Sequence, residues 1–169
     1  MDLEYTVTEI ISRDGRGQVV QLDYQFEETT TAETASTSSV GMTRQNKEKR
    51  SRSYGANITR DQYKNIASRQ RNALPFDSFV TVLRPFILGF YSGNELERAF
   101  NILDRDHSGK IHIYELASFL PILNESIDDV ALLNYIRKVD QDFDENMNFN
   151  EFRALVLRGI GRDIICNHL

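Results

Sequence analysis

The stretch that decides the fold reads DRDHSGKIHIYE and runs from Asp104 to Glu115. If Asp104 is position 1, side-chain oxygens recur at positions 1, 3 and 5, a glycine stands at position 6 and a carboxylate at position 12. A hard cation such as Ca²⁺ takes about six to eight oxygen ligands, and a glycine at position 6 permits the sharp bend that turns them inward. The spacing therefore predicts a 12-residue calcium-binding loop between two helices. The predicted ligand positions are held by Asp104, Asp106, Ser108, Lys110 and Glu115.

A second stretch, DQDFDENMNFNE, repeats this spacing 36 residues later, from Asp140 to Glu151. Position 6 is Glu145 here, and holding a non-glycine residue at positive φ costs on the order of 1 kcal/mol. The loop also has a carboxylate, Asp144, where the first loop has Ser108, which strengthens its attraction for a dication. We expect Ca²⁺ in both loops, with strain and extra charge acting in opposite directions in the second. Its predicted ligand positions are held by Asp140, Asp142, Asp144, Asn146 and Glu151.

Apolar residues recur at helical spacing on both sides of each loop. Before the first loop they form an i, i+3, i+4, i+7 stripe over residues 94–103, and after it a helix is expected over 113–120, stopped by Pro121. A further helix, capped by Ser126, leads into the second loop, and another follows that loop over 152–158. The pattern predicts two consecutive helix–loop–helix units.

The first loop resembles the EF-hand superfamily at positions 1, 3, 5, 6, 8 and 12, and the second does so except at position 6. This resemblance implies that the two units pair, with Ile111 and Met147 at position 8 facing each other in a short two-stranded link. It implies a lobe over residues 93–160 similar to one lobe of calmodulin, within a C-terminal domain (93–169) that ends in a tail. It also implies Ca²⁺ as the ion that the lobe binds.

Residues 58–92 resemble a degenerate EF-hand without metal ligands. If Leu74 takes position 8 and Phe79 begins the outgoing helix, Ala67 falls at position 1 and Ser78 at position 12, and neither supplies a carboxylate. The alternative is a pair of amphipathic helices joined by a polar turn. Either interpretation predicts a scaffold without a metal site.

The N-terminal residues 1–26 alternate apolar and polar side chains with a period of two on both sides of the turn sequence RDGRG, residues 13–17. This pattern is typical of a two-stranded β-hairpin. A partly disordered segment is the alternative.

Residues 27–57 contain almost no large apolar side chain, so we expect a disordered linker, rich first in Ser and Thr and then in basic residues. The basic run over 44–52 could contact an acidic surface, such as an anionic membrane, or carry an import signal or a phosphorylation site. Nucleic-acid binding is not expected, because no aromatic residues are interleaved for base stacking. A solvated linker is the default interpretation.

The composition indicates a soluble intracellular protein of mainly α fold. No run of 18 or more residues is apolar, and residues 1–10 lack the basic-then-apolar pattern of a secretory signal. The expected compartment is the cytoplasm, with the nucleus as an alternative. The single cysteine, Cys166, excludes an intramolecular disulfide. An enzyme is not expected, because the three histidines have no partnered nucleophile and no phosphate-cradling glycine motif occurs.

Two classes of function remain open for the calcium lobe. In a sensor, calcium changes the angle between helices and exposes an apolar groove to a partner helix, whereas a buffer or structural protein binds calcium without opening. Only three methionines occur, which favours a sensor with a selective partner over a promiscuous one. The regulatory subunit of an enzyme is a further alternative. The residues expected to line the groove are Phe100, Leu116, Phe119, Leu120, Phe152 and Leu155. The tail over 160–169 or the hairpin could fill this groove in the absence of a partner.

Overall fold

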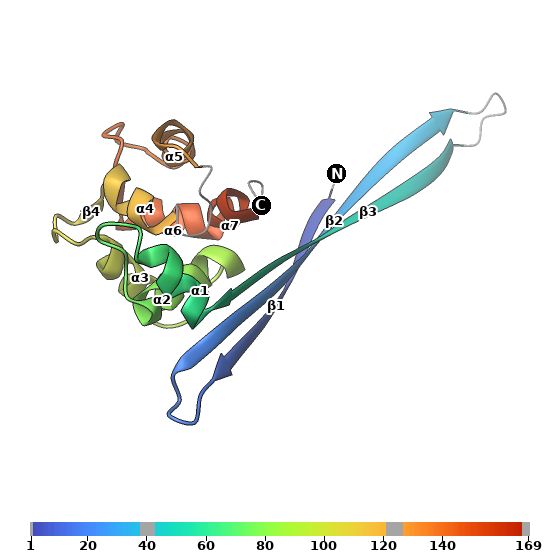
Figure 1. The fold of residues 1–169 in the computed structure, drawn as a ribbon. Helices are drawn as coiled ribbons and strands as arrows, with labels where there is room; N and C mark the ends of the chain where they lie inside the picture. The colour runs from blue at the N-terminus through green and yellow to red at the C-terminus, as the bar shows by residue number, and fades with distance from the viewer. Residues whose placement is uncertain (1, 38–42, 121–126, 167–169) are drawn as a thin grey trace. The chain divides into compact units, whose positions relative to one another are not determined.

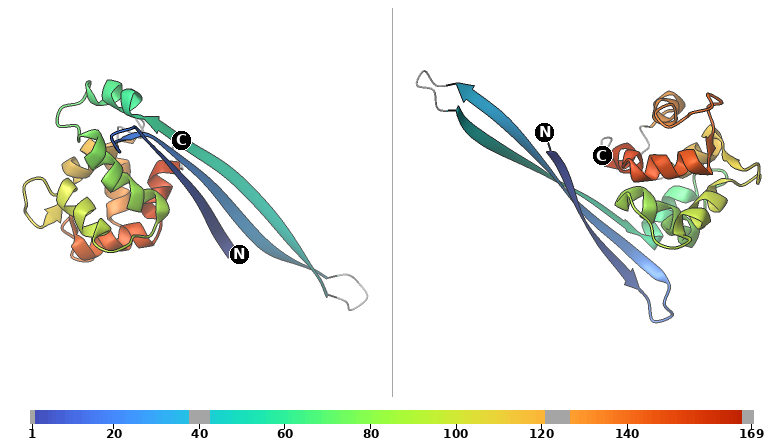
Figure 2. Two further views of the ribbon diagram at one scale, coloured as in Figure 1. Left: turned by 90° about the horizontal axis from the view of Figure 1, so that it is seen from below. Right: turned by 180° about the vertical axis from the view of Figure 1, so that it is seen from behind.

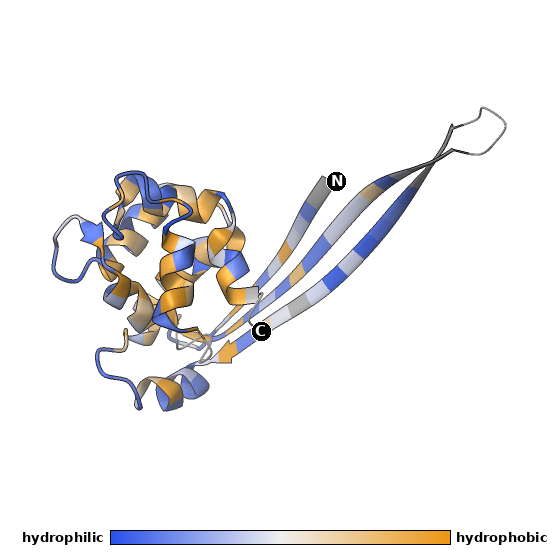
Figure 3. Ribbon diagram, turned by 90° about the horizontal axis from the view of Figure 1, so that it is seen from above, coloured by the Kyte–Doolittle hydropathy of each residue, from blue (hydrophilic) through white to orange (hydrophobic). Residues whose placement is uncertain are grey.

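The computed structural model describes residues 2–37, 43–120 and 127–166. The chain divides into two compact units, Met1–Thr59 and Arg60–Leu169, which we call the sheet unit and the helical unit. Most of the hydrophobic segments belong to the helices, whereas strand β3 (Thr43–Thr59) of the sheet unit is largely hydrophilic (Figure 3). In the described part of the chain, no helix is long and apolar enough to cross a membrane.

The sheet unit is a three-stranded antiparallel sheet in the order β1 (Asp2–Arg13), β2 (Val19–Thr37) and β3 (Thr43–Thr59) (Figure 1). The predicted hairpin is present in its first two strands. Its turn forms because the Asp14 carboxylate accepts hydrogen bonds from the amides of Arg16 and Gln18, at 2.8 and 2.9 Å. Gly17 closes the turn with φ 78°, a conformation that glycine adopts without a steric penalty.

The prediction of a disordered linker over 27–57 is wrong for residues 27–37 and 43–57, and residues 38–42 lie outside the described ranges. Residues 27–37 and 43–57 lie in β2 and β3, which pair from Gln21↔Thr59 to Thr37↔Thr43 and run side by side in both views of Figure 2. Threonine, abundant in β2, favours strands, and the acidic strand lies opposite the basic one. Glu28 pairs with Arg52 in the register, and Glu33 with Lys47, whose Nζ lies 3.6 Å from the carboxylate. Low apolar content therefore did not predict disorder correctly, because each of the two segments is paired with the other as a strand of the sheet.

The fold class is consequently mixed rather than mainly α, with an all-helical second unit apart from two short strands. Its helices are α1 (Arg60–Ala67), α2 (Phe76–Leu88), α3 (Glu95–Leu103), α4 (Ile113–Phe119), α5 (Asp129–Ile136), α6 (Phe149–Leu157) and α7 (Ile160–Cys166). Its two-residue strands are β4 (Lys110–Ile111) and β5 (Met147–Asn148).

The helices predicted around the two acidic loops are present as α3, α4, α5 and α6, and the tail forms α7 (Figure 1). Pro121 and Ser126, predicted to stop one helix and cap the next, lie outside the described residues. The cap of α5 is Asp128, whose carboxylate accepts a hydrogen bond from Ala131 N at 2.8 Å. An aspartate satisfies a free amide of the first turn as well as a serine does.

Helix α2 is central to the core of the helical unit, where it packs against α3 and α7. Phe86 of α2 lies 5.5 Å from Phe119 and 5.7 Å from Phe152 between ring centroids, and Phe79 lies 5.4 Å from Phe119. Gly161 lets α7 approach, since a Cβ there would come within 2.5 Å of Phe86 Cδ1. Aromatic rings from α2 thus contact both outgoing helices, α4 and α6, of the acidic loops.

The α1–α2 segment shares backbone features with the two acidic loops. With Leu74 at position 8, Asn72 falls at position 6 and has φ 64°, close to the left-handed values of Gly109 and Glu145. Helix α2 begins at Phe76, position 10, rather than at Phe79 as expected, and the helices after both acidic loops also begin at position 10. A degenerate EF-hand over 58–92 stays a prediction, with this backbone correspondence in its favour.

Candidate metal centre

The two outer carboxylates of the first loop are buried and held by the backbone of the loop itself. Asp104 is 4% exposed and Glu115 is 2% exposed. Asp104 accepts hydrogen bonds from Ser108 N at 3.0 Å and Gly109 N at 2.9 Å, the latter made possible by the φ of 83° at Gly109. Glu115 accepts from Arg105 N at 2.8 Å and His112 N at 2.9 Å. Both ends of the loop therefore turn a carboxylate inward.

The predicted ligand residues of the first loop converge on one region. Carboxylate oxygens of Asp104, Asp106 and Glu115 all lie within 4.8 Å of one another. The Ser108 hydroxyl lies 3.3 Å from Asp104 Oδ1 and donates to the Lys110 carbonyl at 3.0 Å, which brings that carbonyl toward the cluster. Hydrogen bonding from Ser108 lowers the pKa of Asp106, so this carboxyl is ionised at neutral pH.

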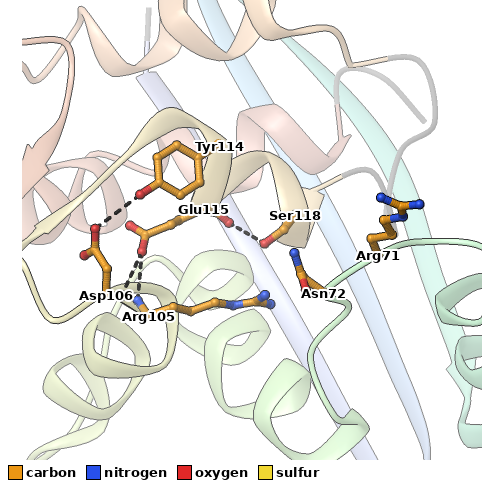
Figure 4. Close-up of a pocket in the computed structure, with 7 residues that line it drawn as sticks. All are labelled: Arg71, Asn72, Arg105, Asp106, Tyr114, Glu115 and Ser118. Carbon is orange, nitrogen blue, oxygen red and sulfur yellow. Dashed lines mark hydrogen bonds between the residues drawn. The ribbon is translucent and has the colours of Figure 1, made fainter.

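A cavity of about 380 Å³ lies beside the first loop (Figure 4). It brings the side chains of Asp106 and Glu115 together with residues of α4 and of the α1–α2 connection. The Tyr114 hydroxyl donates to Asp106 at 3.2 Å and the Ser118 hydroxyl donates to the Glu115 carbonyl at 2.7 Å. The cavity is lined by Arg71, Asn72, Arg105, Asp106, Tyr114, Glu115 and Ser118. Two of the loop carboxylates therefore face this cavity together with two arginines.

The second loop has the same backbone form in spite of Glu145 at position 6. Glu145 adopts φ 61°, and its amide donates to Asp140 Oδ2 at 3.0 Å, as Gly109 does to Asp104. Glu151, 2% exposed, accepts from Gln141 N and Asn148 N, each at 2.9 Å. The hydrogen bond from the Glu145 amide therefore accompanies a glutamate held in the left-handed region, a conformation that costs a non-glycine residue energy.

Three of the predicted ligand residues of the second loop, its aspartates, also gather, whereas Glu151 is not part of that cluster. Oxygens of Asp140, Asp142 and Asp144 lie within 4.8 Å of one another, while Asn146 donates its side-chain amide to the Asp144 carbonyl at 3.0 Å. Asp140 is 9% exposed, and its Oδ1 is buried without a hydrogen-bond partner. A buried carboxylate oxygen without a partner is costly, and a bound cation would remove that cost. Because the donors are oxygens, the residues fit Ca²⁺ rather than a softer metal.

The two loops are joined by main-chain pairing and by side chains. Strands β4 and β5 are antiparallel, with Lys110 opposite Asn148 and Ile111 opposite Met147. Ile111 and Met147, both fully buried, are the pair expected at position 8. His112 Nδ1 also lies 2.6 Å from Asn146 Oδ1, across the two loops.

The side chain of Lys110 enters the second loop, which sequence reasoning missed. Its ammonium donates to Asp142 Oδ2 at 3.0 Å and to Asp144. These bonds raise the pKa of Lys110, and the bond from Lys110 is the main reason that the pKa of Asp144 is lowered. From the sequence, Lys110 was a candidate ligand because position 7 contributes a main-chain carbonyl, and no role was predicted for its side chain. A lysine at that position, beside a loop with an extra aspartate, was the only available signal.

Comparison with known proteins agrees with this geometry. Residues 94–157 match the family model described as an EF-hand domain pair. The chain is 36% identical over 88 residues to cell division control protein 31 of Saccharomyces cerevisiae, covering 52% of this chain and 55% of that protein. It is 29% identical over 103 residues to the probable calcium-binding protein CML7 of Oryza sativa subsp. japonica, covering 60% and 70%. It is 32% identical over 101 residues to calcium-dependent protein kinase 4 of Plasmodium berghei, covering 59% of this chain and 17% of the kinase.

The helical unit is thus built around a paired helix–loop–helix module of the calcium-binding class. Residues 94–157 form an EF-hand domain pair with two acidic loop clusters, as the loops predicted. Over this part the chain is similar to cell division control protein 31 and to a calmodulin-like calcium-binding protein. The chain spans only part of the length of each of these relatives, 55% of the yeast protein and 17% of the kinase.

Proposed function

We propose that this chain is a calcium sensor, which binds one Ca²⁺ in each acidic loop and regulates a selective protein partner. The observation that carries the calcium part is the convergence of buried and exposed carboxylates in both loops, including an Asp140 oxygen that has no protein partner. Side chains at positions 1, 3 and 5, the carbonyl at position 7 and the bidentate glutamate at position 12 supply the oxygen ligands. Lys110 and Asn146 contribute that carbonyl.

Calorimetric titration with calcium tests the two sites. The intact chain is expected to bind two ions, and Asp104→Ala and Asp140→Ala are each expected to reduce the stoichiometry to one. The proposal for the second site fails if Asp140→Ala leaves the stoichiometry unchanged. Asp163→Ala, which removes a carboxylate from α7 outside both loops, is the matched control and is expected to bind two ions.

The sensor part of the proposal rests on the state of the groove residues. All six are buried, and aromatic side chains of α2 contact two of them, Phe119 and Phe152. Ile164 and Ile165 of α7 are also buried, and α7 packs against α2 and α6. The chain's own helices fill the groove, which corresponds to the closed state of a sensor. This supports regulation, because calcium binding could then open the groove to a partner.

The tail was expected as one occupant of the groove, and its burial as α7 supports that hypothesis. Helix α2 is an additional cover that sequence reasoning did not foresee, because its apolar residues had been assigned to the degenerate unit. We propose that a partner helix with apolar residues at i, i+3 and i+7 spacing takes the place of one of these two helices when calcium is bound.

Fluorescence of a hydrophobic dye separates a sensor from a buffer. In the sensor, calcium is expected to increase dye fluorescence of the intact chain, and Ile164→Gln is expected to increase it further by weakening the hold of α7. If calcium leaves the fluorescence unchanged in both proteins, the chain is a buffer or a structural calcium protein. Leu157→Gln, at a side chain that is 50% exposed on α6, is the control for a general effect of lost apolar surface.

Regulation of an enzyme is the second candidate. It is favoured by the similarity to a segment that makes up 17% of a calcium-dependent protein kinase. Capture of a partner from cytoplasmic extract with and without calcium, followed by its identification, tests this candidate. The cytoplasm remains the proposed compartment.

A further inference from the structure

Lys110 is placed to act on both loops at once. It is position 7 of the first loop and the first residue of β4, where it pairs with Asn148 of the second EF-hand. Its main-chain carbonyl accepts a hydrogen bond from Ser108 within the first loop. Its ammonium reaches across the link to Asp142 and Asp144 of the second loop.

We propose that the Lys110 ammonium is a built-in counter-cation of the second loop, which pairs with Asp142 and Asp144 without calcium, offsets one of their two negative charges and must leave before calcium can bind them. The proposal deepens the proposed function and rests on the second loop being a calcium site. It follows that the second loop requires a higher calcium concentration than its four carboxylates alone would require.

The competition arises because the lysine and the ion use the same oxygens. Asp142 and Asp144 hold positions 3 and 5, and each would give calcium one oxygen. In the structure both direct Oδ2 at the ammonium, which lies between them. Asp140 is not reached by the lysine, and its Oδ1 stays without a partner. The ion pairs of Lys110, which we call the Lys110 tether, therefore satisfy Asp142 and Asp144 and leave the more buried Asp140 for the ion.

The arrangement is one-sided. The residue at position 7 of the second loop is Asn146, which is neutral and bonds His112 rather than a first-loop carboxylate. Arg137, near the second loop, pairs at 2.9 Å with Glu145, which holds no ligand position. Within the ranges that the structure describes, no lysine or arginine side chain forms an ion pair with the first-loop ligand carboxylates. The basic group beside Asp106 is His112 of the same loop, whose Nε2 lies 3.7 Å from Asp106 Oδ2. The first loop is consequently free to fill first.

Substitution of Lys110 tests the competition in the intact chain. In an Asp104→Ala background, where only the second loop binds, Lys110→Met is expected to tighten calcium binding by about fivefold, as expected for two partly exposed ion pairs. Lys110→Arg keeps the charge and is expected to stay within about twofold of the parent. Lys64→Met, on an exposed part of α1, removes the same charge away from the loops and is also expected to stay within about twofold.

The inference is overturned if Lys110→Met binds calcium no more tightly than Lys64→Met. A second measurement needs no calcium: a double-mutant cycle between Lys110→Met and Asp142→Asn, read as thermal unfolding in chelator, is expected to show favourable coupling. Zero coupling would contradict the proposed pairing of Lys110 with Asp142, even if both loops bind calcium. Unchanged stoichiometry in Asp140→Ala, by contrast, would reject the second calcium site while the cycle still reports on the tether.

Discussion

The two acidic loops have the same ligand spacing but hold their carboxylates in different ways. In the first loop, amides of Ser108 and Gly109 satisfy Asp104, and a glycine makes the bend. In the second loop, Glu145 makes the bend at φ 61°, a lysine from the first loop holds two aspartates, and Asp140 Oδ1 has no partner. One loop is self-contained, and the other depends on its neighbour.

This difference shows that a count of carboxylates does not rank the two sites. The second loop has four ligand carboxylates against three in the first, but Lys110 offsets one of them. Counting only the ligand carboxylates and the Lys110 ammonium, both sites then carry three negative charges. What distinguishes the loops is the cost of freeing the ligands and of holding Glu145 in the left-handed region.

The largest expected effect comes from removing the bidentate glutamate at position 12 of either loop. Glu115→Gln and Glu151→Gln each take away a charged, buried ligand, and each is expected to weaken its own site by about 4 kcal/mol, or roughly a thousandfold. Calorimetry should show one remaining site in both variants. The remaining site should be the tighter one in Glu151→Gln, and equal remaining affinities would contradict the difference between the loops.

Next in size is the loss of the apolar contact between the loops. Ile111 and Met147 are fully buried and paired, so Ile111→Ala or Met147→Ala is expected to lower the free energy of unfolding by about 3 kcal/mol. Chemical denaturation in chelator measures this loss. Because the link is shared, calcium affinity should fall at both sites in either variant. Leu157→Ala, at a half-exposed side chain, is the control and is expected to be nearly neutral.

Exchanging the residue type at position 6 should reduce the difference in calcium affinity between the two loops. Glu145→Gly removes the strain at φ 61° and is expected to tighten the second site by about fivefold, close to 1 kcal/mol. Gly109→Ala should weaken the first site by a similar factor, because a Cβ there meets no atom within 4 Å and only the backbone conformation is penalised. Titration of each single variant measures the change. A fall in affinity for Glu145→Gly would mean that the Arg137–Glu145 ion pair matters more than strain.

The smallest expected effect concerns the influence of the first loop on the α1–α2 segment. Burial raises the pKa of Tyr63 to about 12, while Arg105 at position 2 of the first loop lowers it in part. The unfolded chain releases this proton near pH 10. The stability that the neutral phenol contributes is therefore fully present below pH 10 and is lost as pH rises from 10 through 12.

Ultraviolet titration of tyrosinate should show a phenol that titrates near pH 12 and is absent in Tyr63→Phe. Arg105→Gln is expected to delay that titration slightly, whereas Arg137→Gln, near the second loop, should not change it. Equal effects of the two arginines would contradict a contribution specific to the first loop.

The local parts of the fold could be predicted from the sequence. Both acidic loops, the helices around them and the turn at Asp14 depend on residues that are close in the chain, so spacing alone indicates them. The strands over 27–37 and 43–57 were missed because their partners lie on another strand. The start of α2 at Phe76 was misplaced by three residues, since no carboxylate marks position 12 of that segment.

The sequence by itself determined which residues are the candidate calcium ligands, because all of them in a loop fall within 12 consecutive residues. Only the tertiary structure decided what controls those ligands. The Lys110 side chain meets Asp142 and Asp144 from 32 and 34 positions away, and Phe86 of α2 contacts Phe119 and Phe152, which are likewise distant in the sequence. Such contacts depend on how packed helices bring distant residues together, and no local spacing encodes them.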